Sequence, residues 1–358
     1  MKGKKILSII LLTFIIPLLC SCYDYSELER EILIFTLGID KVSDGYVVSA
    51  ETLDASDYGG ELNVKPEVIT SKGDSIYEAL SILDGKFNNK VNLTHCELII
   101  VGEKYAKEDG IYDILNLVYE KNNLRFNTIF TTTYDSSAEE ILMSKEGHET
   151  FHGFEILEQL SKNKLFSDNS RAYKIINSIE NSGIELTLPV IKVAKSEEKK
   201  NFYANKIAVF RGDKLAGYID DKDVNYYSLL MNEKNSIQIK MKEEDNLINA
   251  KVSLKKTRTS IKNNRLNIDM DVNAYIESNK KKNTSKEKLK SALENKLKRD
   301  LNNFIEETQK RFKLDICGYG YQLNNYKEKK NNQNWNRYYE NLNRNIDVHV
   351  TLKEDMEE

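Results

Sequence analysis

Hydrophobic residues recur along the chain with two spacings, and together they predict alternating strands and helices in its first part. Apolar or alternating runs predict strands at residues 32–40, 46–52, 64–71, 95–101 and 125–134. Apolar residues three or four positions apart predict helices at 75–87 and 106–121, because this spacing places them on one helical face. Asp44-Gly45 predicts a hairpin turn between the first two strands.

Helices dominate the predicted structure of the next segment, which ends at a charged run. The helical spacing continues at residues 136–143, 151–166 and 170–180, and a strand follows at 185–194. Ser136, with Glu139 three residues later, predicts a capping box at the start of the first helix. Residues 195–201 contain no apolar side chain, so we expect a domain boundary there.

Long strands and one long helix characterise the rest of the chain. Strands are expected at 202–210, 214–218, 236–242, 247–257, 266–276 and 345–352. Residues 284–312 carry a stripe of Leu and Phe side chains, which predicts a helix packed on a sheet. Shorter helices are expected at 220–231 and around Trp335. Asn263-Asn264 predicts a turn between two of the long strands.

This order of elements predicts an α+β, multi-domain protein with mixed β-sheets, each flanked by α-helices. The length of 358 residues suggests two or three domains. We expect a helical middle domain or subdomain between two α/β domains, and the predicted bounds are 22–135, 136–200 and 201–358.

The N-terminal 22 residues have the pattern of a bacterial lipoprotein signal. Lys2, Lys4 and Lys5 precede an apolar run that is too short to span a bilayer, which takes about 20 residues. The run ends in Leu19-Cys20-Ser21-Cys22, which fits a lipobox of apolar, any, small and cysteine residues. We therefore expect residues 1–21 to be a signal peptide and Cys22 to be lipidated. An ordinary signal peptide or an uncleaved anchor is the alternative, and Pro17 argues against an anchor.

Composition excludes some classes of protein and leaves the cysteines open. The chain is 40% hydrophobic and 30% charged with a formal net charge of −3, so no basic field indicates binding to nucleic acid. Cys96 and Cys317 follow the lipobox; they could form one disulfide, but the sequence does not indicate whether they are close. Two cysteines are too few for a metal site, which usually needs three or four converging ligands.

One motif is compatible with zinc chemistry. His148-Glu149-Thr150-Phe151-His152 fits H-E-x-x-H, which on a helix puts two imidazoles one turn apart with the glutamate as base. Gly147 and Gly153 flank the motif and disfavour a continuous helix. A third ligand is required, and Glu180 and Glu185 are candidates only by their separation in the chain. We therefore predict no metal, no cofactor and no catalytic residue, and keep a zinc peptidase as the least favoured hypothesis.

Other polar and aromatic residues give weaker indications. His95 is expected to be a structural residue at the start of a strand. No nucleophile elbow, P-loop or dinucleotide fingerprint occurs in the chain. Aromatic residues are numerous in polar segments, and they indicate either an interface or packing against the long helix: Tyr226, Tyr227, Tyr319, Tyr321, Trp335, Tyr338 and Tyr339.

Short motifs in the first half follow one another in an order typical of one protein family. The segment Cys22-Tyr23-Asp24-Tyr25-Ser26-Glu27-Leu28 resembles a Cys-Trp-Asp-x-x-Glu-Leu start, with Tyr23 in place of Trp. Leu37-Gly38-Ile39-Asp40 resembles a first strand that ends in Gly-Ile-Asp. The stretch from Thr94-His95 to Gly102-Glu103 resembles a His-x-x-x-x-x-x-Gly-Glu strand, with Ala106 and Gly110 in the helix that follows.

The second half continues the same series. Phe210 through Leu215-Ala216-Gly217 resembles a Phe-x-x-x-x-Leu-x-Gly hairpin. Asp315-Ile316-Cys317-Gly318-Tyr319-Gly320 resembles an Asp-x-Phe-Gly-x-Gly turn, with Cys317 in place of Phe, and Trp335 resembles a tryptophan before the last strand. In this order the motifs resemble the C-subunit lipoproteins of spore germinant receptors, the Ger(x)C family.

The resemblance implies a non-enzymatic receptor subunit of three α/β domains, on the outer face of the spore inner membrane. It implies that lipid on Cys22 holds the protein to the bilayer, and that it works with the integral-membrane A and B subunits to convert nutrient detection into release of ions and dipicolinate. The family offers no catalytic residues to transfer. The alternative is a lipid-anchored solute-binding protein feeding a permease, which the consecutive long strands disfavour.

Overall fold

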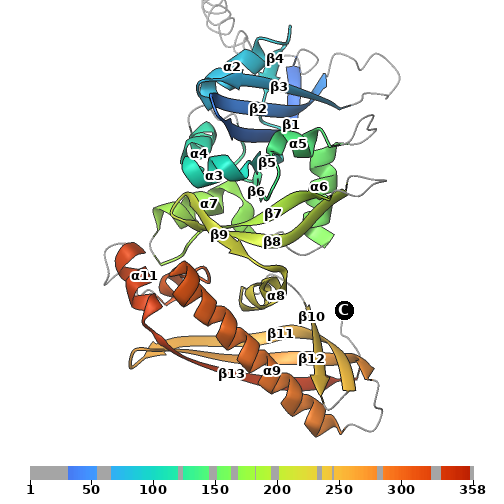
Figure 1. Ribbon diagram of the computed structural model, residues 1–358, viewed down its shortest axis with the longest axis vertical. Helices are drawn as coiled ribbons and strands as arrows, with labels where there is room; N and C mark the ends of the chain where they lie inside the picture. The colour runs from blue at the N-terminus through green and yellow to red at the C-terminus, as the bar shows by residue number, and fades with distance from the viewer. Residues whose placement is uncertain are drawn as a thin grey trace, which may run out of the picture.

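The protein consists of two β-sheets that lie one beyond the other along its long axis (Figure 1). In this computed structural model the described residues are 31–54, 66–119, 124–144, 151–162, 168–181, 183–194, 201–231, 236–243, 246–279, 285–323 and 332–354. Together they form an α+β fold of mixed sheets and helices, which confirms the predicted fold class.

The first sheet has the strand order β3-β2-β1-β5-β6-β7-β8-β9, and β4 also pairs with β1. Its central strands β1, β5, β6 and β7 are parallel, whereas antiparallel strands extend it at both ends. The strands are β1 (Glu31–Val42), β2 (Gly45–Asp54), β3 (Glu67–Gly73), β4 (Lys90–Asn92), β5 (Leu98–Val101), β6 (Ile129–Thr133), β7 (Thr187–Ala194), β8 (Asn201–Arg211) and β9 (Lys214–Ile219).

Helices cover both faces of this sheet, so its central strands are apolar on both sides. In β5, Ile99 and Val101 contribute to one buried cluster, whereas Leu98 and Ile100 contribute to the other. The first cluster includes residues of α2 (Ile76–Asp84), α3 (Glu103–Glu108), α4 (Tyr112–Tyr119) and α7 (Ala172–Glu180). The second includes residues of α5 (Ala138–Leu142) and α6 (His152–Lys162). A short 3-10 helix, η4 (Asp168–Ser170), precedes α7.

The second sheet has the order β10-β11-β12-β13 and is covered on one face by the long helix α9 (Lys286–Glu307), as Figure 1 shows. Strands β10 (Ile237–Glu243), β11 (Asn246–Lys262) and β12 (Arg265–Asn279) form an antiparallel meander, and β13 (Asn343–Lys353) is parallel to β12. Asn263 and Asn264 both have positive φ, as a tight two-residue hairpin requires.

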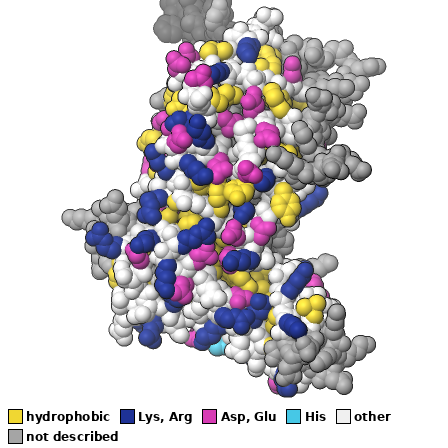
Figure 2. Space-filling model, in the orientation of Figure 1, with side chains coloured by type: hydrophobic (Ala, Val, Ile, Leu, Met, Phe, Trp, Pro, Cys, Tyr) yellow, Lys and Arg dark blue, Asp and Glu magenta, His cyan; other side chains and the backbone are white. Residues whose placement is uncertain are grey.

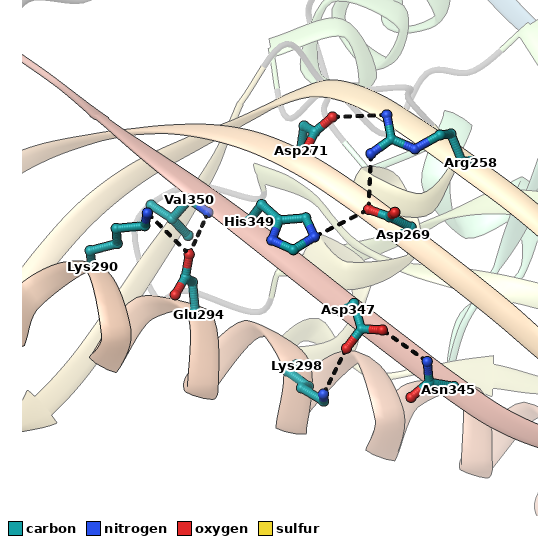
Figure 3. Close-up of polar contacts among 10 residues, drawn as sticks. All are labelled: Arg258, Asp269, Asp271, Lys290, Glu294, Lys298, Asn345, Asp347, His349 and Val350. Atoms are coloured by element: carbon teal, nitrogen blue, oxygen red, sulfur yellow. Dashed lines mark hydrogen bonds and ion pairs between the residues drawn. The ribbon is translucent and has the colours of Figure 1, made fainter. Parts of the chain in front are cut away.

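The predicted leucine stripe of α9 is buried, and α9 also covers the free edge of β13 (Figure 3). Glu294 accepts a hydrogen bond from the Val350 backbone N–H at 2.9 Å, and Lys298 pairs with Asp347 at 2.9 Å. The first contact satisfies one backbone N–H of an edge that would otherwise present unpaired backbone groups, and the second is an ion pair between side chains. On the other face of the sheet, Arg258 pairs with carboxylates of β12, and His349 lies 3.5 Å from one of them.

The remaining helices lie near the join between the two sheets. α8 (Asp221–Leu230) follows β9, and α9 continues as a π-helical turn, η5 (Thr308–Phe312). α10 (Tyr319–Gln322) and α11 (Asn332–Glu340) precede β13. No helix in the described ranges combines the length and the apolar character needed to cross a membrane.

Some boundaries differ from the sequence-based expectation. The segment 195–200, where we expect a domain boundary, connects β7 to β8, and these two strands pair within the first sheet, so the domain bounds stay a prediction. The N-cap of α5 is Ser137, whose side chain accepts from the Glu140 N–H, and not Ser136. His95 lies in a turn and not at the start of a strand, since β5 begins at Leu98. Local polarity marks a connection, but it does not distinguish a loop within a sheet from a link between domains.

Candidate functional site at the junction of the two sheets

A buried carboxylate, Asp315, organises the turn that joins α9 to the end of the chain. Its side chain has no exposed surface, and its Oδ2 accepts hydrogen bonds from the Gly320 N–H and the Trp335 Nε1–H, both at 2.8 Å. Gly318 has a φ of 68°, which favours glycine at the start of α10. A Cβ on Gly320 would collide with the Trp335 ring. This turn therefore needs an acid, two glycines and a tryptophan in contact.

The network continues from this turn to the first sheet. The Asp315 backbone N–H donates to Asn336 Oδ1 at 3.2 Å, and Asn336 Nδ2 donates to Glu185 Oε1 at 2.5 Å. Glu185 lies just before β7, and its other oxygen accepts from the Gly212 N–H in the turn between β8 and β9. Arg211 donates to the Phe312 carbonyl at 2.9 Å. Buried polar contacts thus tie the two sheets together, and Glu185 and Asn336 form their centre.

Burial controls the charge of this junction. Desolvation raises the pKa of Asp315 to about 7; hydrogen bonds from Gly320, Tyr319 and Trp335 oppose this shift, and the nearby Glu185 charge adds to it. Burial also raises the pKa of Glu185, against the lowering effect of Asn336, Gly212 and Arg211. Two acids of raised pKa therefore share one buried network between the sheets.

A second buried acid, Asp40, fixes helices to the end of β1. Its two oxygens accept hydrogen bonds from the Ala138 and Glu139 backbone N–H groups at the start of α5, both at 2.9 Å. Gly102 passes so close to Asp40 that a Cβ there would collide with the carboxylate. Burial raises the pKa of Asp40, although the two amide hydrogen bonds lower it. Glu103 accepts from the Asp135 N–H at 2.9 Å. The motifs Gly38-Ile39-Asp40 and Gly102-Glu103 therefore position helices on the sheet.

Most of the aromatic residues singled out in the sequence are buried, so the packing interpretation is confirmed for them. Five have at most 9% exposed surface, which leaves no free ring for a partner: Tyr226, Tyr227, Tyr319, Trp335 and Tyr339. Two of their hydroxyls have hydrogen-bond partners in the same region: the Tyr227 hydroxyl lies 2.8 Å from the Thr187 hydroxyl, and the Tyr226 hydroxyl donates to Asp300 at 2.6 Å. Only Tyr321 of the group is classed as exposed, at 40%.

The H-E-x-x-H motif lies partly outside the described residues, since these resume at Phe151. His152 begins α6 and is buried, and its backbone N–H donates to the buried carboxylate of Glu51, whose Oε1 also lies 3.2 Å from the imidazole Nδ1. The Gly153 N–H and the Thr36 hydroxyl donate to the second oxygen of Glu51, at 3.0 and 2.7 Å. Glu51 therefore holds the start of α6 against the first sheet.

The other predicted sites are placed as follows. Cys22, the predicted lipidation site, lies outside the described residues. Cys96 and Cys317 are buried free thiols and do not form a disulfide, and burial raises the pKa of Cys96 to about 12. Glu185, considered as a third zinc ligand, belongs to the junction. Within the described ranges, no three His, Cys, Asp or Glu side chains converge as a metal site would require.

Fold and junction together define a class: an α+β protein of two sheets in series, joined by a buried polar network. Two family models match the chain; the first ends within β7 and the second begins within β8. A model described as "Spore germination protein N-terminal domain" covers residues 24–193, and one described as "Spore germination B3/ GerAC like, C-terminal" covers residues 205–355. The chain belongs to the GerAC-like family of spore germination proteins. This confirms the family that the motifs indicated.

Individual relatives agree with this assignment. The chain is 22% identical to "Putative spore germination protein YfkR" of Bacillus subtilis (strain 168) over 341 residues, which is 88% of this chain and 87% of the relative. It is 21% identical to "Spore germination protein B3" of the same organism, with 84% of each chain covered. The solved structure "Crystal Structure of the GerBC protein" has the same fold, with a TM-score of 0.52, 17% identity, and coverage of 92% of this chain and 99% of that one.

Proposed function

We propose that this chain is the lipid-anchored C subunit of a nutrient germinant receptor, and that it acts through contacts with integral-membrane A and B subunits and not as an enzyme. Family membership supports the assignment to a germinant receptor subunit. Lipid on Cys22 holds the protein on the outer face of the spore inner membrane. The meander β10–β12 is unlike the doubly wound lobes of a solute-binding protein, so that alternative is not favoured.

The observation that carries this proposal is that the family motifs make buried contacts within the fold. Asp40 and Asp315 are both buried. The Asp40 carboxylate accepts from two backbone N–H groups, and the Asp315 carboxylate accepts from one backbone N–H and the Trp335 indole. Gly102 and Gly320 are required by close packing against the same two acids and their partners. Because these motif residues make internal contacts, they support a structural role. A rigid body of this kind can present its surface to other proteins.

The position of the first strand supports an anchor at one end of the molecule. β1 begins at Glu31, nine residues after Cys22, and lies in the part of the first sheet remote from the second sheet (Figure 1). Each buried methylene of an acyl chain contributes about 0.8 kcal/mol, so two chains hold a protein stably on a bilayer. The second sheet is then displayed away from the anchored end.

Replacement of the predicted lipidation site tests the proposal. In spores that carry only the variant, Cys22→Ala should release the protein from the membrane fraction and abolish nutrient germination. Cys20→Ala is the matched control, because Cys20 leaves with the signal peptide; it should keep both properties. Immunoblots of membrane and soluble fractions measure retention, and loss of refractility on nutrient addition measures germination. Membrane retention with normal germination in Cys22→Ala spores would refute the proposal.

A further inference from the structure

A groove of about 550 Å³ lies between strand β10 and helix α9 in the second sheet. β10 is the edge strand of this sheet, and among the described strands it pairs only with β11. The helix wall is formed by side chains at spacings of three and four, which is one face of α9: Lys288, Ser291, Ala292, Asn295, Lys296 and Arg299. A free strand edge thus runs along a groove whose helix wall includes small side chains.

The groove is strongly cationic. Five basic residues line it, against one carboxylate, Glu287: Lys240, Lys242, Lys288, Lys296 and Arg299. Asp300 pairs with Lys296 at 2.8 Å and with Arg299 at 3.3 Å, so these two charges are partly compensated. Lys240 and Lys288 have no ion-pair partner within the described part of the chain. Figure 2 shows Lys and Arg side chains spread over the part of the surface where α9 lies.

The basic residues stand on both sides of the strand edge. Met241 is buried and faces the interior, so the exposed Lys240 and Lys242 project from the opposite face of β10. Lys288 and Arg299 belong to α9, which covers the other face of the sheet. A strand added beside β10 would therefore find positive charge next to its side chains on both faces. Lysine on an edge strand discourages pairing with neutral or basic strands, whereas an acidic strand gains from it.

We propose that this groove binds an extended acidic segment of a partner protein, which adds a strand to the free edge of β10. Backbone hydrogen bonds from the edge would supply affinity, and the basic side chains would select acidic sequences. From Lys288 to Arg299 the helix rises about 16 Å, at 1.5 Å per residue. An extended chain of about five residues has that length, at about 3.3 Å per residue. A single phosphate or lipid headgroup would reach only a small part of this row.

The inference goes beyond the receptor assignment and can be tested on the full chain purified in detergent. The probe is a fluorescent ten-residue peptide of Glu, Asp, Thr and Val with acids on both faces of the strand. Fluorescence anisotropy should show saturable binding that weakens with salt. The double variant Lys240→Glu/Lys288→Glu should bind at least about tenfold more weakly, because it reverses one charge on each side of the edge. Lys104→Glu, at an exposed position of α3, is the matched control and should bind normally.

Two further peptides separate strand addition from simple charge attraction. A peptide with Gln and Asn in place of the acids should not bind. A peptide with alternate backbone amides methylated keeps its charge but loses its hydrogen-bond donors, so it too should bind at least about tenfold more weakly. Full binding of the methylated peptide would overturn strand addition. Equal loss of binding in the Lys104→Glu control and in the double variant would overturn the groove as the site.

Other occupants give distinct results. Binding of phosphatidylglycerol vesicles through Lys240 and Lys288, without peptide binding, would assign the groove to lipid headgroups and overturn the proposal. Peptide binding seen only after removal of residues 355–358, three of which are acidic, would assign the groove to the chain's own tail and overturn the proposal. If the double variant loses its native circular dichroism, the milder Lys240→Gln and Lys288→Gln variants replace it, and the same decrease in affinity, smaller in size, is expected.

Discussion

Replacement of Asp315 by asparagine should remove a specific pH dependence of stability. Asparagine is neutral at all relevant pH values and still offers one oxygen to the Gly320 N–H and the Trp335 indole, which Asp315 Oδ2 accepts at 2.8 Å. The substitution therefore removes the titrating proton while most of the local contacts are kept. Since Asp315 is fully buried, its charged form is the costly one.

The sign and size of the effect come from the pKa shift. The folded protein raises the pKa of Asp315 from 3.8 to about 7, so between these values the folded state binds the proton more tightly than the unfolded state. The contribution of Asp315 to the free energy of unfolding is fully present below about pH 4 and is lost as the pH rises toward 7. At about 1.4 kcal/mol per pKa unit, the whole loss is about 4 kcal/mol, as an upper bound.

Urea unfolding of wild type and Asp315→Asn from pH 4 to pH 8 measures this difference. Trp335 is the only tryptophan of the chain, and its indole contacts Asp315, so its fluorescence reports the junction directly. The free energy of unfolding of the variant, minus that of wild type, should increase by up to about 4 kcal/mol as the pH rises. Asp74→Asn, at an exposed position, is the control and should follow wild type. Parallel pH profiles for wild type and Asp315→Asn would refute the reasoning.

Two other substitutions test the structural use of the family motifs. Asp40→Ala removes both acceptors at the start of α5 and should lower the free energy of unfolding by about 2–3 kcal/mol, measured by urea titration; Asp40→Asn should cost less. Gly320→Ala forces a Cβ against Trp335 and should cost about 1–3 kcal/mol with a shift in Trp335 emission. Gly212→Ala, in open space at a φ of 63°, should cost about 1 kcal/mol and leave the emission unchanged.

Elements with a strong local signal were predicted well from the sequence. The hairpin of β1 and β2 and the buried stripe of α9 follow from turn chemistry and from hydrophobic periodicity, which depend on neighbours in the chain. The placement of β8 and β9 in the first sheet was not predicted. It depends on pairing between β7 and β8 across the polar segment 195–200, and strand pairing leaves no mark in local composition.

Only some residues of the junction could be identified from the sequence. Asp315, Gly320 and Trp335 lie in recognisable motifs, but of their partners Glu185 was only a candidate zinc ligand and Asn336 was not singled out. The apolar neighbours Ile184 and Leu186 were the one available signal, since a carboxylate inside an apolar run is either exposed on one face of a strand or buried with a partner. Choosing between these needs the position of Asn336, which is 151 residues away.

In the part of the chain that the structure describes, this junction connects the two ends of the molecule. One continuous apolar cluster runs from Leu98 in the first sheet, through Tyr227 of α8, to Val350 in the second. The polar contacts of Glu185 with Asn336 and Gly212 cross the same boundary. A cluster and a network that both span the join favour unfolding as one unit, because neither part can open without exposing the other's core. A segment bound at β10 would then act on a body that is continuous as far as the first sheet.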